Sequence, residues 1–164
     1  MRDATGDRPS AVLTVLWIGL VAGTLDISEN IIFNYFRGIT PKMIFQYIAS
    51  GLIGMRSIQM GAASVALGVV IHCLIALTWT TIFYLASRRI PALTRHPVIS
   101  GLTFGGVVYL VMNFAVLTLT AVPHVRAAKT PAALISAVLA LLLCIGLPIS
   151  WLVKRFAPPG PLEN

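Results

Sequence analysis

Two carboxylic acids interrupt an apolar stretch near the start of the chain, and they are the residues best placed to do chemistry. Asp26 and Glu29 both lie within the run 11–36. An ionisable group inside a membrane-spanning helix costs roughly 2.5–3.5 kcal/mol on insertion scales, so such groups usually mark function. The i, i+3 spacing puts both carboxylates on one helix face. They are therefore the first candidates for a binding site.

Polar residues of two further apolar runs reach a similar depth. With a rise of 1.5 Å per residue, Asp26 lies about 15 Å and Glu29 about 10 Å from one membrane surface. From the same surface, His72 lies about 16 Å deep and Asn113 about 12 Å deep. The sequence therefore predicts one intramembrane site, with these members and two secondary candidates: Asp26, Glu29, His72, Asn113, and secondarily Asn30 and His124.

Such a cluster has several uses, and the residues alone do not name a cofactor. Asp26 and His72 could relay protons, because burial and pairing can bring both groups to titrate near neutrality. Asp26, Glu29 and His72 could instead ligate a divalent metal, with Asn113 bonded to one of the ligands. The site could also hold the polar head of a lipid-soluble ligand such as a quinone.

Two purely structural interpretations stand beside these. In the first, a carboxylate bonds His72 or Asn113 and locks the helices together without any further role. In the second, Glu29 lies with Asn30 among the lipid headgroups, where it is hydrated and Arg37 supplies a counter-charge.

The composition indicates that lipid is the solvent of these helices. Of 164 residues, 57% are hydrophobic and 10% are charged, whereas a soluble domain carries about 25% charged residues. The mean hydropathy is +0.89. The net charge of +7 comes with no basic patch interleaved with aromatic residues, which argues against nucleic acid as a partner. Basic residues near the ends of apolar runs fit contact with membrane lipids instead.

The apolar runs define the predicted architecture. A membrane span needs about 20 mostly apolar residues, and the runs that meet this length are 11–36, 61–87, 97–121 and 131–153. Residues 41–53 follow a capping Thr40, begin with Pro41 and are too few to cross. We expect an all-α integral membrane bundle of four transmembrane helices plus a short interfacial or re-entrant helix. It forms a single membrane domain, 11–155, between polar tails 1–10 and 156–164.

Small residues recur every four positions in the spans, as expected where membrane helices pack closely. The clearest examples are Gly19 and Gly23 in the first span and Gly101 and Gly105 in the third. The second and fourth spans carry similar stripes, which are Ser64, Gly68, His72, Ala76 and Thr80, and Ser136, Ala140, Cys144 and Leu147. We interpret Cys73 and Cys144 as inert, and the tryptophans Trp17, Trp79 and Trp151 as an aromatic belt.

The distribution of basic residues predicts an orientation. With four spans, both termini and the loop 88–96 share one side of the membrane, which carries seven lysines and arginines against five on the other. Cytoplasmic loops are enriched in these residues. The count favours cytoplasmic N and C termini.

Several sequence blocks resemble a YagU-like family of small, four-helix proteins of bacterial inner membranes. The blocks are GTLD (23–26), YIASGLIG (47–54), ALG (66–68) with His72, LVMN (110–113), VPH (122–124) and CIGLPIS (144–150). The resemblance implies a multi-pass protein of the bacterial inner (cytoplasmic) membrane. It implies no particular reaction.

Transport or proton translocation is the function that we expect from the intramembrane site. The alternatives are a structural or accessory subunit of a larger membrane complex and a protein that binds a quinone-type cofactor. An enzyme is less well supported, because the sequence has no nucleophile triad, phosphate-binding glycine loop or zinc signature. Four spans are few to enclose a pathway, so we expect a homo-oligomer or partner membrane subunits.

Overall fold

The computed structural model describes residues 10–121 and 130–156, and the regular elements within these ranges are all helical. Two spans are single α-helices, α1 (Ala11–Tyr35) and α4 (Ala62–Arg89). The other two each contain a π-helical turn. The third consists of α6 (Pro97–Val111), η1 (Met112–Val116) and α7 (Leu117–Leu119), and the fourth of α8 (Pro131–Ala140), η2 (Leu141–Gly146) and α9 (Leu147–Phe156).

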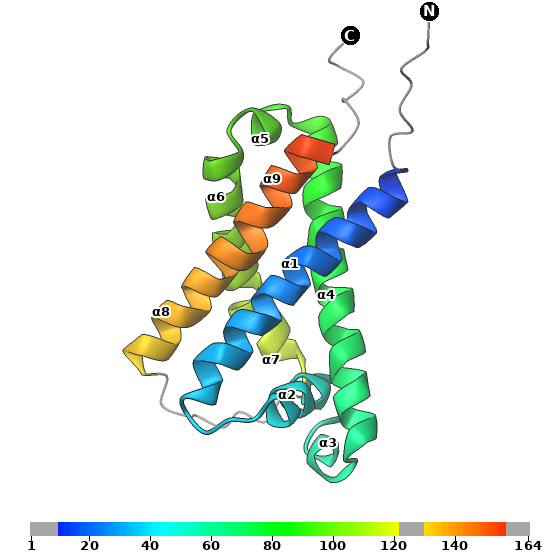
Figure 1. The fold of residues 1–164 in the computed structure, drawn as a ribbon, viewed down its shortest axis with the longest axis vertical. Helices are drawn as coiled ribbons and strands as arrows, with labels where there is room; N and C mark the ends of the chain where they lie inside the picture. Colours follow the sequence, from blue (N-terminus) through cyan, green and yellow to red (C-terminus); the bar gives the residue numbers. More distant parts are fainter. Residues whose placement is uncertain (1–9, 122–129, 157–164) are drawn as a thin grey trace, which may run out of the picture.

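Four helices in the described part of the chain are long and apolar enough to cross a membrane, which confirms the predicted fold class. In Figure 1, α1 begins and α9 ends at the end of the bundle where the short helix α5 (Ala92–Arg95) lies. The helices α2 (Pro41–Ile53) and α3 (Arg56–Gln59) lie at the opposite end.

The helix α2 has the predicted bounds and the predicted cap. The side chain of Thr40 accepts a hydrogen bond from the backbone N–H of Met43 at 3.4 Å, and Pro41 occupies the first turn. The missing side chain of Gly68 lets α2 approach α4 closely, because a Cβ at this position would collide with the backbone carbonyl of Phe45. The amide of Ala121 also donates to the carbonyl of Gly51 at 3.0 Å. These contacts fix α2 across one end of the bundle.

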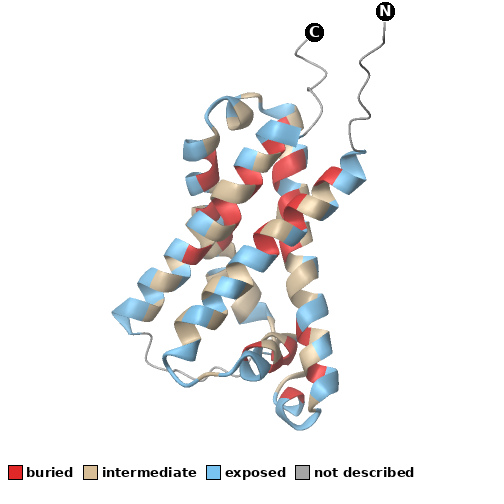
Figure 2. Cartoon of the chain, viewed as in Figure 1, coloured by how far each residue is buried: buried red, intermediate tan, exposed pale blue. Residues whose placement is uncertain are grey.

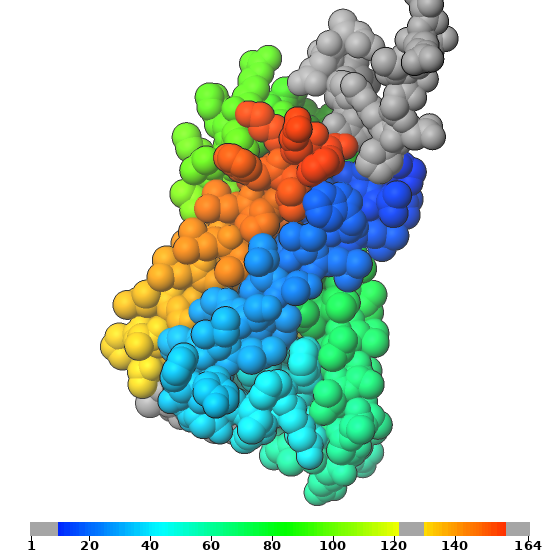
Figure 3. Space-filling model, in the orientation of Figure 1, coloured from blue at the N-terminus to red at the C-terminus, as the bar shows by residue number. Residues whose placement is uncertain are grey.

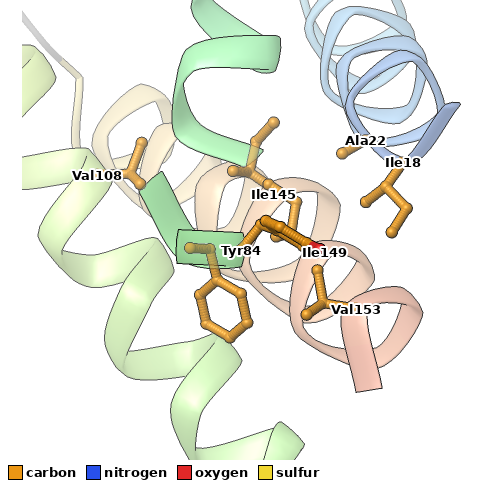
Figure 4. Close-up of a cluster of buried hydrophobic side chains, with 8 residues drawn as sticks. Ile18, Ala22, Tyr84, Val108, Ile145, Ile149 and Val153 are labelled. Carbon is orange, nitrogen blue, oxygen red and sulfur yellow. The ribbon is translucent and has the colours of Figure 1, made fainter. Parts of the chain in front are cut away.

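The core lies where α1, α4, α6 and α9 meet, and most of the buried residues lie there or between α2 and α4 (Figure 2). Its apolar part, which we call the apolar plug, is shown in Figure 4 and consists of Ile18, Ala22, Phe83, Tyr84, Val108, Ile145, Ile149 and Val153. In the space-filling view, α1 lies on the front face between the fourth span and α4 (Figure 3).

The predicted small-residue stripe of the third span lies in backbone contact with the fourth span, at Gly146 and Leu141. A Cβ on Gly101 would lie 2.8 Å from the carbonyl oxygen of Gly146, and one on Gly105 would lie 2.5 Å from that of Leu141. Close approach of this kind is how membrane helices gain packing energy without a hydrophobic driving force.

Two π-helical turns, η1 and η2, interrupt the helices on either side of this contact. In η2 the amide of Leu147 donates to the carbonyl of Leu142, five residues back, and the next residue, Pro148, has no amide hydrogen. The wider turn thus ends two residues before Pro148, and both prolines and π turns are common causes of a kink in a helix. Turns of this type occur frequently at functional sites.

Candidate functional site

An inner cavity of about 230 Å³ lies among the spans and is lined by two of the predicted site residues, Asp26 of α1 and His72 of α4. Its remaining walls are mainly apolar and come from α1, α2, α4 and the third and fourth spans. They consist of Ile27, Asn30, Ile44, Tyr47, Ile48, Ile75, Ala76, Trp79, Val108, Met112, Leu141 and Ile145.

Asp26 presents its carboxylate to this cavity without a direct partner. Among the described residues it accepts no hydrogen bond and forms no ion pair, although it lies within electrostatic range of His72 and Glu29. A carboxylate inside a membrane is normally paired or serves a ligand. The side chain is therefore free to bind a ligand or a proton from the cavity.

His72 joins α4 to the backbone of α1. Its Nε2 lies 2.8 Å from the carbonyl oxygen of Gly23. Because a carbonyl only accepts hydrogen bonds, Nε2 must carry the hydrogen, and in the neutral ring Nδ1 is then an acceptor. The missing side chain of Gly23 allows the approach, since a Cβ there would lie 2.9 Å from the Cβ of Ala76. The ring is thus held in one orientation beside Asp26.

Glu29 points to a different neighbour. The hydroxyl of Ser136 in α8 donates a hydrogen bond to Oε1 of Glu29 at 2.7 Å. Glu29 does not line the inner cavity. It therefore acts as a tie between the first and fourth spans.

Asn113 also lies outside the lining. Its Nδ2 donates to the carbonyl of Tyr109 in its own span at 3.0 Å, and the residue before it, Met112, lines the cavity instead. The structure thus brings Asp26 and His72 to one cavity and leaves Glu29 and Asn113 beside it. The second secondary candidate, His124, lies outside the described residues.

The arrangement expected for a metal centre is not present. In residues 10–121 and 130–156, no three His, Cys, Asp or Glu side chains are grouped so that they could hold an ion. The reason is that Asp26 and Glu29 diverge, one toward the cavity and the other toward Ser136. The described residues thus provide no three-ligand group made of Asp26, Glu29 and His72.

A second, outer cavity of about 490 Å³ adjoins the first at the end of the bundle that carries α2 and α3. Asn30, Ile44 and Tyr47 line both cavities, so these side chains separate the two spaces. Asn30 accepts a hydrogen bond at Oδ1 from Nδ2 of Asn34, 3.2 Å away, and burial raises the pKa of the Tyr47 phenol above its usual value. The boundary between the cavities is therefore uncharged at neutral pH.

The outer cavity has a polar frame built around Gln46. The Gln46 amide nitrogen donates to the carbonyl of Ser57 at 3.3 Å and to the hydroxyl of Ser64 at 3.3 Å. These bonds join α2 to α3 and α4. They hold the wall of the outer cavity in place.

At the opposite end the inner cavity borders the apolar plug. Val108 and Ile145 belong both to its lining and to the apolar plug. The plug continues from there toward the end where α9 terminates (Figure 4). The apolar plug therefore lies on one side of the inner cavity and the outer cavity adjoins it on the other.

Sequence reasoning missed the aromatic wall of the site. Trp79 lines the cavity and packs edge-on against Phe104, with ring centroids 5.9 Å apart. Trp79 therefore contributes to the lining, and the aromatic belt stays a prediction. A signal was available, because Trp79 follows His72 by seven residues, which is two helical turns on the same face.

Cys144, which the sequence predicts to be inert, lies within electrostatic range of Asp26 and Glu29. It belongs to the π-helical turn η2. Its place in the small-residue stripe of the fourth span indicates that it faces the bundle, whereas no signal in the sequence reveals the π turn.

No protein-family model, curated protein or solved structure matches the chain. The resemblance to YagU-like proteins stays a prediction.

Proposed function

We propose that this protein is a small membrane transporter that translocates protons or another ion through the inner cavity. The observation that carries the proposal is the carboxylate of Asp26, which lines a cavity between membrane-spanning helices beside His72 and has no direct partner among the described residues. Acidic residues and histidines inside membrane-spanning helices are typical of proton relays and ion pathways. A residue that only locked the helices together would be bonded across them, as Glu29 is to Ser136.

The two adjoining cavities supply the route. Among the described residues, the side chains that the two cavities share, Asn30, Ile44 and Tyr47, lie between a ligand in the outer cavity and Asp26. The apolar plug blocks the opposite side. Transport then requires the helices to rock so that the plug opens and the boundary at Tyr47 closes, which is the alternating access of secondary transporters.

The π-helical turns are the features best suited to such movement. Both η1 and η2 contribute to the wall of the inner cavity, through Met112 and through Leu141 and Ile145. A π turn leaves the regular α-helical hydrogen-bond ladder locally, so it offers a hinge within a span. The helices on either side can then tilt without unfolding.

The membrane and the orientation are part of the same proposal. Among the described residues, five basic side chains lie at the end where α9 terminates: Arg88, Arg89, Arg95, Lys154 and Arg155. Three lie at the other end, and they are Arg37, Lys42 and Arg56. This asymmetry supports cytoplasmic termini in a bacterial inner membrane. The outer cavity would then open to the non-cytoplasmic side. We expect a homo-oligomer or partner membrane subunits, because four helices enclose little space.

Reconstitution tests the proposal. The purified protein is placed in liposomes that contain a pH-sensitive dye, and internal pH is followed after a potential is imposed with potassium and valinomycin. We expect proton or proton-coupled flux for the wild type, loss of flux for Asp26→Asn, and retained flux for Glu29→Gln as the matched loss of a charge. Equal flux in all three would overturn the proposal.

The rival function, an accessory subunit, predicts a different result. An accessory protein would give no flux with either variant or with the wild type. It would instead co-purify with the same membrane proteins whether residue 26 is Asp or Asn.

A further inference from the structure

We propose that the ligand of the inner cavity is a small lipophilic organic monocation, with its charge beside Asp26 and its apolar body against Trp79 and Tyr47. This inference rests on the proposed function and names the substrate class of the same site. The geometry points to a cation that carries its own apolar shell, and three properties of the cavity lead to it.

The first property is the charge. Asp26 is the carboxylate in the lining, and it has no cationic side chain bonded to it among the described residues. Burial of an unpaired carboxylate is costly, and an opposite charge at close range offsets that cost. A monocation matches the single carboxylate, since Glu29 is engaged by Ser136 and lies outside the lining.

The second property is the apolar wall. Inorganic cations demand a shell of oxygen ligands, typically six or more for the divalent ions. Apart from Asp26, the polar side chains that line the cavity are Asn30, Tyr47, His72 and Trp79. No group of three acidic, histidine or cysteine side chains that could hold a metal is found in the described ranges. A bare inorganic ion would lose its hydration without adequate replacement, whereas an alkylated ammonium is already surrounded by carbon.

The third property is the pair of aromatic rings. Trp79 and Tyr47 come from different helices, α4 and α2, and both face the cavity. The ring of Trp79 is held by its edge-on contact with Phe104 at 5.9 Å. Aromatic faces attract quaternary ammonium groups, and tryptophan does so best. A carboxylate and two aromatic rings that line one cavity are thus suited to an organic cation.

The size of the cavity limits the ligand to a small one. Pockets for drug-sized molecules measure about 300–1,000 Å³, and the inner cavity measures about 230 Å³. Benzyltrimethylammonium is therefore a suitable probe. Neopentylbenzene, in which carbon replaces the nitrogen, is its neutral isostere.

A proton and the cation should compete for Asp26. The titratable groups that face or approach this carboxylate are His72 on α4, Glu29 on α1, Tyr47 on α2 and Cys144 in the fourth span. Binding of the cation is expected to weaken as pH falls, because a protonated carboxyl no longer offers a charge.

Fluorescence of Trp79 can report binding directly. The chain has three tryptophans, and the substitutions Trp17→Phe and Trp151→Phe leave Trp79 as the single reporter. In nanodiscs of this background, benzyltrimethylammonium should change the emission saturably. Asp26→Asn should weaken binding at least about tenfold, and Glu29→Gln should leave it unchanged. By titration calorimetry, Trp79→Ala should weaken binding about three- to tenfold, with partial recovery in Trp79→Phe.

The outcomes separate this inference from the proposed function. Equal binding of the neutral isostere, or unchanged cation binding in Asp26→Asn, would overturn the cation assignment and favour a quinone-type ligand. Absence of cation binding together with Asp26-dependent proton flux would overturn the inference and leave the proposed function standing. Asp26-dependent cation binding without any flux would support the site and refute transport.

Discussion

The imidazole of His72 donates a hydrogen bond from Nε2 to the backbone carbonyl of Gly23 at 2.8 Å, across the contact between α4 and α1. This bond joins the two helices that supply the polar side of the inner cavity. It also directs the other ring nitrogen, Nδ1, away from that carbonyl. The orientation of the histidine is therefore set by the backbone, one helical turn from Asp26.

Substitution of His72 should affect both stability and function. His72→Ala removes an interhelical hydrogen bond, and such bonds contribute about 0.6–2 kcal/mol in membrane proteins. We expect a loss of that size in the free energy of unfolding in detergent, together with loss of proton flux. Cys73→Ala, at the adjacent position, serves as the control and should leave both unchanged. A His72→Ala variant of wild-type stability would contradict the role of this bond.

We expect that no larger residue can replace Gly68, whereas a larger residue can replace Gly106. A Cβ at Gly68 would collide with the carbonyl of Phe45, but a Cβ at Gly106 would meet nothing within 4 Å. Overpacking of this kind costs about 1–3 kcal/mol. Gly68→Ala should therefore detach α2 from α4 and raise hydrogen exchange in 41–53, measured by mass spectrometry. Gly106→Ala should be neutral or slightly stabilising, and equal exchange in the two variants would refute the packing of α2.

Glu29 and Ser136 should behave as one structural unit. The hydroxyl-to-carboxylate bond of 2.7 Å links α1 and α8, and a hydrogen bond to a charged group contributes about 1.5–3 kcal/mol where it is well sheltered. Glu29→Gln and Ser136→Ala should each lower the unfolding temperature. The double variant should be little worse than either single one, because both remove the same bond. Additive losses would show that the two residues act independently.

Gln46 should hold the wall of the outer cavity. Its amide donates to Ser57 and Ser64 from a buried position. Gln46→Leu keeps the size of the side chain but removes the donor and leaves the acceptors unpaired, at about 1–3 kcal/mol. We expect faster proteolysis of residues 54–61 in this variant, which limited digestion measures. We also expect slower transport, which the flux into liposomes measures. Gln59→Leu, at an exposed position, should have neither effect.

Much of the fold could be predicted from the sequence because its signals are local. The four apolar runs give the four spans, and the capped start at Thr40 and Pro41 gives the bounds of α2. The spacing of Gly101 and Gly105 locates the close contact between the third and fourth spans. In each case the residue type determines the local structure. Apolar side chains favour lipid, proline and a capping threonine favour a helix start, and glycine permits close contact between helices.

The site could be predicted only in part, because its geometry depends on how the helices cross. Residues at i and i+3 lie about 60° apart around a helix, and in α1 this angle is enough to aim Asp26 at the cavity and Glu29 at Ser136. The depth of Asn113 was counted along a continuous α-helix. The π turn that starts at Met112 changes the direction of the following side chains. No pattern in the sequence indicates this turn.

The proton flux of liposomes that contain the Asp26→Asn variant tests most directly whether Asp26 is needed for transport. The comparison requires that the variant is inserted and unfolds at the same temperature as the wild type. Liposomes of equal protein content should show Asp26-dependent flux in the wild type and in Glu29→Gln, and background flux in Asp26→Asn. That result would establish Asp26 as the functional carboxylate of the inner cavity. Wild-type flux in a folded Asp26→Asn protein would contradict it.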